Sequence, residues 1–263
     1  MAAFRQAADR KCGFLVTMAA VQMSQGIYLP GFAPIEYQEG APVDLKVNKM
    51  TSAKTQLPYS YYKLPYCQPS VIQESVENLG ETLMGDLVEN SPYVLNLLKN
   101  ETCKVLCKRP LPMEDKDKFR SMIEDEYTVN WMVDNLPAAT RYRMRNAPPG
   151  VEAEKGFRYS DGFLVGVERK GRYFVHNHVL LDIRYHSNPE LYEGYRIVGF
   201  EVEPRSMDQK LTEDQSQPGG YRADCGRDRP MDPFEIDSHD AIAYTYDLRW
   251  TYSEVRWASR WDA

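Results

Sequence analysis

The order of apolar and polar residues along the chain predicts many short β-strands. In several stretches apolar side chains occupy every second position, which is the pattern of a strand with one buried face. This period of two predicts strands at residues 43–47, 93–98, 103–108, 127–133, 141–145, 163–168, 172–185, 195–202 and 242–250. Residues 93–98 and 103–108 are expected to pair across a turn at Asn100. Residues 163–168 are expected to form a hairpin with 172–185.

One stretch, residues 114–127, has the helical period instead. Phe119, Met122 and Ile123 fall on one face and Tyr127 extends it, while acidic residues and lysines fill the other face. The chain is therefore expected to be mainly β, a β-sandwich or two packed antiparallel sheets with one amphipathic helix. Residues 27–263 are expected to form one domain. The stretch 146–155 is either a loop within this domain or a linker that subdivides it.

Residues 55–70 (TQLPYSYYKLPYCQPS) interrupt both patterns. Their three prolines have a fixed φ and push the preceding residues, Leu57, Leu64 and Gln68, toward extended backbone. The segment is therefore expected to run extended rather than helical. Its four tyrosines would supply large buried rings, and Cys67 would supply a covalent anchor.

The first 26 residues are typical of a secretory signal peptide. Three basic side chains precede a short apolar run at residues 12–23, and small residues near the end of the segment suit a signal peptidase. A buried helix and a mitochondrial presequence are the alternatives, but the apolar run is too unbroken for a presequence. Removal of this segment would leave 237 residues and change the net charge from −6 to −8.

Composition and motifs exclude several classes of function. An acidic chain argues against nucleic-acid binding, which requires clustered lysine and arginine. Beyond residues 12–23 no stretch approaches the roughly 18 apolar residues of a membrane-spanning helix. The G-x-S-x-G motif of a nucleophile elbow is absent, and no other catalytic motif occurs. The sequence therefore predicts neither an enzyme nor a cofactor.

The five cysteines become four if the first is removed with the signal segment, an even number that suits two disulfides in an oxidising compartment. If residues 103–107 form a strand, its two cysteines lie ~13 Å apart, beyond the ~7 Å limit for a bridge. Cys103 and Cys107 would then each pair with one of the other two, Cys67 and Cys225. A tight or helical turn would join them to each other instead. A zinc site is disfavoured because no C-x₂-C pair occurs.

Three further groups are candidates for modification or binding. Asn100 begins a usable N-glycosylation sequon. His176 and His178 would lie ~7 Å apart on one strand face and could begin a metal site or a pH sensor, although packed or surface histidines are commoner. The arginines at 141, 143 and 145 would share a strand face that could contact sulfated glycans or lipid headgroups, but a solvated face is the default.

The chain closes with Trp257 and Trp261 interleaved with Arg256 and Arg260. Tryptophan is enriched at membrane–water interfaces, so the two rings suit a membrane-interface belt. Ordinary packing beneath the last strand explains them equally well, because tryptophan has an apolar body and a polar N–H.

Six motifs distributed along the chain form a specific set. They are Tyr28-Leu29-Pro30-Gly31, the Pro/Tyr/Cys block at 55–70, Glu77-Asn78-Leu79-Gly80-Glu81 with Gly85, Val133-Asp134-Asn135-Leu136-Pro137, Asn177-His178, and Trp257-Ala258-Ser259-Arg260-Trp261-Asp262. This set resembles the nonaspanins, also called the transmembrane nine superfamily. The resemblance covers the whole chain after the signal segment.

The resemblance implies a lumenal N-terminal domain followed by nine membrane helices, of which the chain as given holds only the lumenal part. It also implies a non-catalytic Golgi or endosomal membrane protein that helps membrane-protein cargo, including proteins with glycine-rich transmembrane segments, to reach its destination. Some members are further implied in adhesion and phagocytosis. The expected partners are therefore cargo and the protein's own membrane half, with the membrane close to the C-terminus. The alternative is a lumenal β-sandwich that binds glycans or another ligand.

Overall fold

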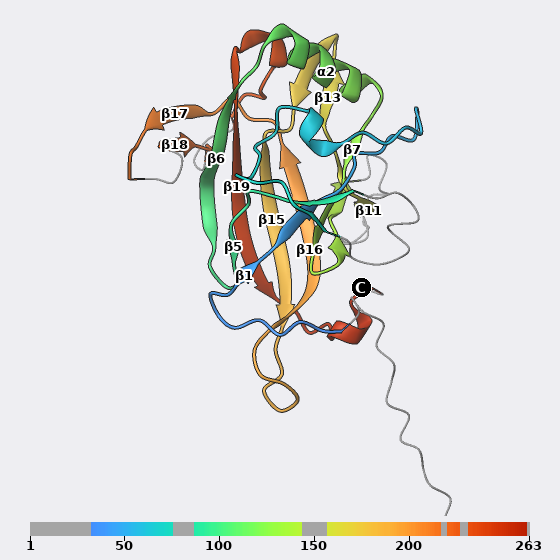
Figure 1. Ribbon diagram of the computed structural model, residues 1–263, viewed down its shortest axis with the longest axis vertical. Coiled ribbons are helices and arrows are strands. Elements are labelled where there is room, and N and C mark those ends of the chain that lie inside the picture. Colours follow the sequence, from blue (N-terminus) through green and yellow to red (C-terminus); the bar gives the residue numbers. More distant parts are fainter. Residues whose placement is uncertain (1–32, 76–86, 144–156, 217–219, 227–230, 262–263) are drawn as a thin grey trace, which may run out of the picture.

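The computed structural model describes residues 33–75, 87–143, 157–216, 220–226 and 231–261 (Figure 1). In this part of the chain the fold is mainly β with one α-helix, which confirms the fold class predicted from the sequence. The predicted signal segment, residues 1–26, lies outside the described residues, and so does the 146–155 stretch. The strands on either side of that stretch pair with each other in one sheet.

Two sheets contain most of the longer strands. The larger has the order β11 (Phe157–Asp161), β10 (Ala139–Arg143), β16 (Arg196–Arg205), β15 (His178–His186), β19 (Ala241–Tyr252) and β6 (Glu101–Pro110). The smaller has the order β3 (Glu74–Ser75), β4 (Val88–Asn90), β2 (Leu45–Val47), β8 (Trp131–Val133) and β9 (Leu136–Pro137). The larger sheet is mixed, because β10 pairs in parallel with β16 and β15 pairs in parallel with β19.

Shorter pairs of strands complete the described architecture. They are β1 (Pro42–Val43) with β5 (Leu95–Asn96), β7 (Thr128–Val129) with β12 (Phe163–Leu164), β13 (Gly166–Arg169) with β14 (Arg172–Val175), and β17 (Lys210–Glu213) with β18 (Tyr221–Asp224). The β13–β14 pair is the hairpin expected around residue 170. The β17–β18 pair, which we call the β17–β18 excursion, projects from the side of the larger sheet (Figure 1).

The hairpin predicted across Asn100 does not form. Strand β5 pairs with β1, whereas β6 pairs with β19, which is more than 130 residues further along the chain. The alternation identified both segments as strands, but a period of two specifies only which face is buried. It does not specify the neighbouring strand.

The single strand predicted at 172–185 is instead two strands, β14 and β15, and the break falls at Asn177. The Asn177 side chain is buried and donates hydrogen bonds to the carbonyl oxygens of Met207 and Ala243, at 2.9 and 3.1 Å. Its own side-chain oxygen accepts one from the Met207 N–H at 2.8 Å. These bonds compensate for burying the amide and fix the point where the chain passes from the small hairpin into the larger sheet.

A layer of aromatic rings packs between the two sheets. Trp131 of the smaller sheet lies 4.9 Å from the Tyr93 ring, which lies 5.1 Å from Tyr246 of the larger sheet. A second aromatic contact with the larger sheet joins Tyr66 to Tyr244, whose ring centres are 5.5 Å apart. Aromatic side chains bury large areas, and their edge-to-face contacts add roughly 0.5–1.5 kcal/mol per pair. The core is therefore organised by rings rather than by aliphatic side chains alone.

Residues 55–70, which we call the ribbon, supply much of this layer of rings. The segment is largely non-helical as predicted, but it contains one 3₁₀ turn, Tyr61–Lys63, which the sequence analysis did not anticipate. That turn brings the Tyr61 and Tyr66 rings into a stacked contact, with centroids 4.4 Å apart. Tyr61, Leu64 and Cys67 are all buried. The prolines thus exclude an α-helix without excluding a single tight turn.

The predicted helix is α2, Met113–Glu124, at the upper end of Figure 1. Phe119, Met122 and Ile123 are buried as the periodicity requires. Tyr127 is buried too but lies beyond the helix, because Glu126 adopts a left-handed φ of 52° and turns the chain into β7.

Candidate functional site

The C-terminal turn is joined to the body of the fold by a buried ion pair. Nη1 of Arg260 donates a hydrogen bond to Oδ2 of Asp134 at 2.6 Å, and both side chains are only 4% exposed. The same nitrogen donates to the carbonyl oxygen of Ile197 in β16, at 3.1 Å. A buried charge pair of this kind is sensitive to the loss of either partner. The terminal motif is therefore part of the folded structure.

The position of Asp134 depends on a tight turn between β8 and β9. Asp134 and Asn135 both adopt left-handed backbone conformations, with φ of 49° and 61°, a region that Asn and Asp tolerate better than most residues. The hydroxyl of Tyr37 also faces Asp134, at 3.4 Å. Burial, followed by the Asp134 charge, raises the pKa of Tyr37 above its ordinary value. Two motifs more than 120 residues apart in the sequence thus meet at one site.

The two tryptophans lie on either side of this arginine. The Arg260 guanidinium carbon is 4.6 Å from the Trp257 ring centre and 5.6 Å from that of Trp261. Trp257 is half-buried, whereas Trp261 is 56% exposed. Cation–π contacts of this geometry hold the exposed ring in a defined place. One ring therefore packs and the other faces outward, and the membrane-interface role of the pair stays a prediction.

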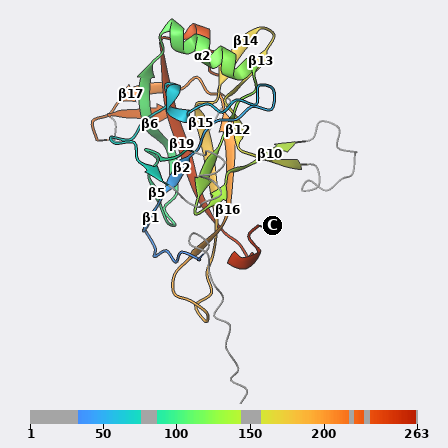
Figure 2. The same ribbon diagram turned by 45° about the vertical axis from the view of Figure 1, so that its right-hand side comes forward.

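Further aromatic side chains gather at the same end of the larger sheet, where β15 and β19 end and β16 begins. We call this region the aromatic end; it comprises Tyr185, Tyr192, Tyr195, Tyr252, Trp257 and Trp261. The Tyr185 ring contacts Tyr195 at 5.6 Å and Tyr252 at 5.9 Å. Both ribbon views place the β15–β16 connection and the C-terminal turn at this end, opposite α2 (Figures 1 and 2).

The β15–β16 connection carries the most exposed large apolar side chain of the described residues, Leu191, at 73%. Next to it, Tyr192 stacks on the Arg196 guanidinium at 3.6 Å, and Arg196 forms an ion pair with Glu36 at 2.5 Å. The contacts of Arg196 thus hold the connection in place next to β16, and its leucine side chain is exposed to solvent. Sequence periodicity missed this feature because a lone leucine in a polar loop has no periodic signal.

The four cysteines outside the signal segment form two bridges. Cys67 pairs with Cys107, with Cα atoms 5.9 Å apart, and Cys103 pairs with Cys225, with Cα atoms 5.7 Å apart. Residues 103 and 107 both belong to strand β6, so they are held apart along the strand and bond to different partners. One bridge attaches the aromatic ribbon to the larger sheet, and the other attaches the β17–β18 excursion.

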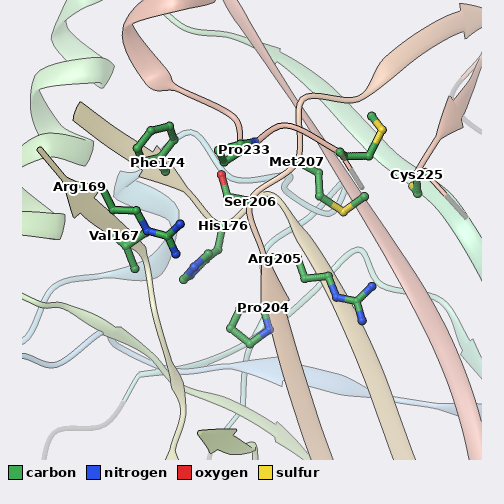
Figure 3. A pocket seen from close by; sticks show the side chains of 12 residues that line it. Val167, Arg169, Phe174, His176, Pro204, Arg205, Ser206, Met207, Cys225 and Pro233 are labelled. Carbon is green, nitrogen blue, oxygen red and sulfur yellow. The ribbon is translucent and has the colours of Figure 1, made fainter. Parts of the chain in front are cut away.

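The two candidate metal ligands, His176 and His178, face different surroundings. His176 Nδ1 lies 2.7 Å from the Leu164 carbonyl oxygen, and its side chain lines a pocket of about 470 Å³ (Figure 3). Burial lowers the pKa of His176. His178 is fully buried and faces Thr245 and Asp247. In the part of the chain that the structure describes, no three His, Cys, Asp or Glu side chains form a group that could hold a metal ion.

The first residue of the sequon, Asn100, is exposed at the start of β6. Its side-chain oxygen accepts a hydrogen bond from the backbone N–H of Trp250 at 2.9 Å, a bond that does not use the amide nitrogen, the atom that carries an N-glycan. The predicted basic face lies elsewhere, on the edge pair β10–β11, where Arg141 is exposed opposite Tyr159. Arg145, the third arginine of that face, lies outside the described residues.

We expect Asn100 to carry an N-glycan when the protein is made in cells. Endoglycosidase treatment should then increase its electrophoretic mobility, and Asn100→Gln should abolish that change. Asn188→Gln is the matched control, because Asn188 does not begin a sequon. An unchanged mobility with the sequon intact would contradict this prediction.

No helix among the described residues is both long enough and apolar enough to cross a membrane. No solved structure resembles the chain closely enough to count as a match. Sequence comparison is more informative. The sequence model of the family described as Endomembrane protein 70 matches residues 58–263.

Curated relatives agree with this family match. The chain is 40% identical to Transmembrane 9 superfamily member 10 of Arabidopsis thaliana, over 90% of this chain and 38% of that protein. It is 35% identical to Transmembrane 9 superfamily member 4 of Rattus norvegicus, over 95% of this chain and 40% of that protein. It is also 37% identical to a Dictyostelium discoideum protein named Putative phagocytic receptor 1a, over 89% and 38% of the two chains.

The chain spans about two-fifths of the length of these curated relatives. The family match extends through the Pro/Tyr/Cys ribbon, the Asp134 turn and the C-terminal turn, which the fold brings into one body. This chain therefore belongs to the endomembrane protein 70 family of membrane proteins, the transmembrane 9 superfamily.

Proposed function

We propose that this chain forms the lumenal domain of a Golgi or endosomal membrane protein that helps membrane-protein cargo to reach its destination, without catalysing a reaction. Its partners would be cargo and the nine-helix membrane half of the same protein. The observation that carries the proposal is the aromatic end. There, the Arg260–Asp134 pair fixes Trp257 and Trp261 beside a group of tyrosines.

The chemistry of the aromatic end fits a membrane–water interface. Tryptophan and tyrosine are enriched where an apolar layer meets water, because each has an apolar body and a polar tip. Trp261 and Leu191 expose apolar surface at this end, whereas the basic side chains Arg196 and Arg260 are engaged in ion pairs. The domain would therefore rest on its membrane half mainly through apolar and aromatic side chains, with Arg256 as an exposed basic side chain beside them.

Rescue of cargo transport in cells tests the proposal. In cells that lack the full-length protein, a membrane reporter with a glycine-rich transmembrane segment should be mislocalised, and the full-length protein should restore its position. Trp261→Ala in the full-length protein is expected to reduce that rescue to the level of cells that lack the protein. The reason is that the domain would lose its outward-facing aromatic contact.

Met113→Ala is the matched control, because Met113 is 64% exposed at the start of α2, at the opposite end of the fold. It should rescue as well as the natural protein. A reporter that localises normally without the protein would contradict the cargo role. Full rescue by Trp261→Ala would contradict the role of the aromatic end.

A further inference from the structure

A cluster of ionisable groups lies beside the Cys103–Cys225 disulfide. The sulfur of Cys225 is 3.9 Å from Nδ1 of His178, and Nε2 of the same ring is 3.5 Å from Oδ2 of Asp247. The other carboxylate oxygen of Asp247 accepts a hydrogen bond from the Cys103 N–H at 2.6 Å. A sulfur, an imidazole and a carboxylate in this order is the arrangement in which a thiol is activated.

The carboxylate determines which nitrogen of His178 carries the proton. An ionised carboxylate only accepts hydrogen bonds, so Nε2, which faces Asp247, carries the hydrogen. In the neutral ring Nδ1 is then an acceptor, and it faces the Cys225 sulfur and the Thr245 hydroxyl, the latter at 2.7 Å. Burial raises the pKa of Asp247, but hydrogen bonds from His178 and the Cys103 N–H outweigh it and lower the pKa below its usual value.

The sulfur of this bridge is accessible from a cavity. Cys225 is half-buried and lines the pocket of about 470 Å³, together with Met207 and two arginines, Arg169 and Arg205 (Figure 3). The imidazole behind the sulfur is only 1% exposed. An external group can therefore approach Cys225 from the pocket while His178 remains on the protected side.

The other disulfide lacks these features. Cys67 is only 4% exposed and packs in the hydrophobic core. The chain has four histidines, all among the described residues, and none of their hydrogen bonds or ion pairs reaches Cys67 or Cys107. Cys107 is half-buried like Cys225, so the two bridges differ chiefly in the imidazole beside one of them, and Cys67–Cys107 serves for comparison.

We propose that Cys103–Cys225 is a thiol–disulfide exchange site. At this site Cys225 forms a mixed disulfide with an external thiol, and His178 takes up and releases the proton that the exchange transfers. The thiolate of the incoming thiol attacks the Cys225 sulfur from the pocket. The Cys103–Cys225 bond breaks, and its electron pair leaves on the Cys103 sulfur. Cys103 takes up a proton from water, and Cys225 now carries the external thiol.

A second external thiol completes the reaction. It attacks the sulfur of the first as a thiolate, and the proton that it releases to water is taken up at Nδ1 of His178. Cys225 leaves as a thiolate beside the imidazolium, which Asp247 stabilises. One protein disulfide and two thiols are thereby converted into two protein thiols and one external disulfide. In the reverse direction, the Cys225 thiolate attacks an external disulfide and Cys103 closes the bridge again.

Arginines on the pocket wall favour an anionic thiol, so reduced glutathione is the probe. The full chain, isolated with both disulfides formed, is incubated with glutathione at pH 7, and the reaction is quenched in acid at set times. The protein is then alkylated and digested, and mass spectrometry identifies the modification of each cysteine. We expect Cys103–Cys225 to be reduced at least about tenfold faster than Cys67–Cys107, with the glutathione adduct on Cys225. Equal rates, or an adduct only on Cys103, would overturn the proposal.

Single substitutions test the role of His178. Cys103→Ser frees Cys225 and Cys67→Ser frees Cys107, so the two thiols can be compared in matched variants. Iodoacetamide at pH 7 should alkylate Cys225 about tenfold faster than Cys107, and adding His178→Asn should remove that advantage. In the Cys103→Ser variants, with and without His178→Asn, the Cys67–Cys107 bridge is intact, and its reduction rate monitors the fold because misfolding would accelerate it. An advantage that persists in His178→Asn with an intact fold would contradict the role of the imidazole.

The external thiol could be a small molecule or part of a protein. Replacing glutathione by a longer peptide with one cysteine distinguishes these two sources. Faster exchange with glutathione supports a small-molecule thiol, and faster exchange with the peptide supports a protein thiol. The exchange site stands in either case. The reaction is independent of the proposed cargo role, because purified protein is sufficient to measure it.

Discussion

Arg260→Met is expected to lower the free energy of unfolding by about 3–5 kcal/mol, because it removes the arginine charge that faces the buried Asp134 carboxylate. At about 2–4 °C per kcal/mol for a domain of this size, the midpoint of thermal unfolding should fall by roughly 10 °C. Thermal and urea unfolding, followed by circular dichroism, measure both quantities. The C-terminal turn should detach first, since Arg260 also bonds to the Ile197 carbonyl.

A double-mutant cycle separates the ion pair from the packing of the arginine stem. Asp134→Asn, which tolerates the left-handed φ of this position, combined with Arg260→Met removes both charges, and the double variant should be more stable than Arg260→Met alone. Arg256→Met changes an exposed arginine four residues away and should leave stability within about 0.5 kcal/mol. An equally small effect of Arg260→Met would show that the pair does not hold the turn.

Replacing both Cys67 and Cys107 by alanine is expected to cost about 4 kcal/mol. The bridge closes a loop with a sequence separation of 40, and in the chain-entropy treatment its loss frees the unfolded chain by about that amount. The native state suffers too, because this bond attaches the tyrosine-rich ribbon to strand β6. Denaturant unfolding of the double-alanine variant measures the loss.

Gln68→Ala is the control for this prediction, since Gln68 is an exposed neighbour of Cys67 in the same ribbon. It should leave stability nearly unchanged. A loss below about 1 kcal/mol in the double-alanine variant would mean that ring contacts alone, such as Tyr61 on Tyr66, hold the ribbon in place.

Local patterns predicted the elements better than their partners. The alternation at 242–250 and the helical period around Phe119 identified β19 and α2 within a few residues. Pairing followed other constraints. Strand β6 pairs with β19 and not with its sequence neighbour β5. The strand expected to continue from 172 to 185 is interrupted at Asn177. Neither event has a local signal, because both depend on contacts with distant segments.

The candidate sites divide in the same way. The sequence named Trp257, Trp261 and the four cysteines, because their residue types and positions are distinctive. It did not single out Asp247, since one acidic residue in a strand resembles any other. It also treated His176 and His178 as a pair, although the change of direction at Asn177 places one in a pocket and the other in the core.

By itself the sequence determined where the longest strands lie, where the helix lies, that the ribbon cannot be an α-helix, and to which family the chain is similar. These properties follow from the period of buried side chains, from the fixed φ of proline and from distinctive short motifs. Only the tertiary structure decided which strands are neighbours, that Asp134 holds Arg260, and that His178 lies between Asp247 and Cys225. Such contacts join residues far apart in the chain, and they arise only when the whole core packs at once.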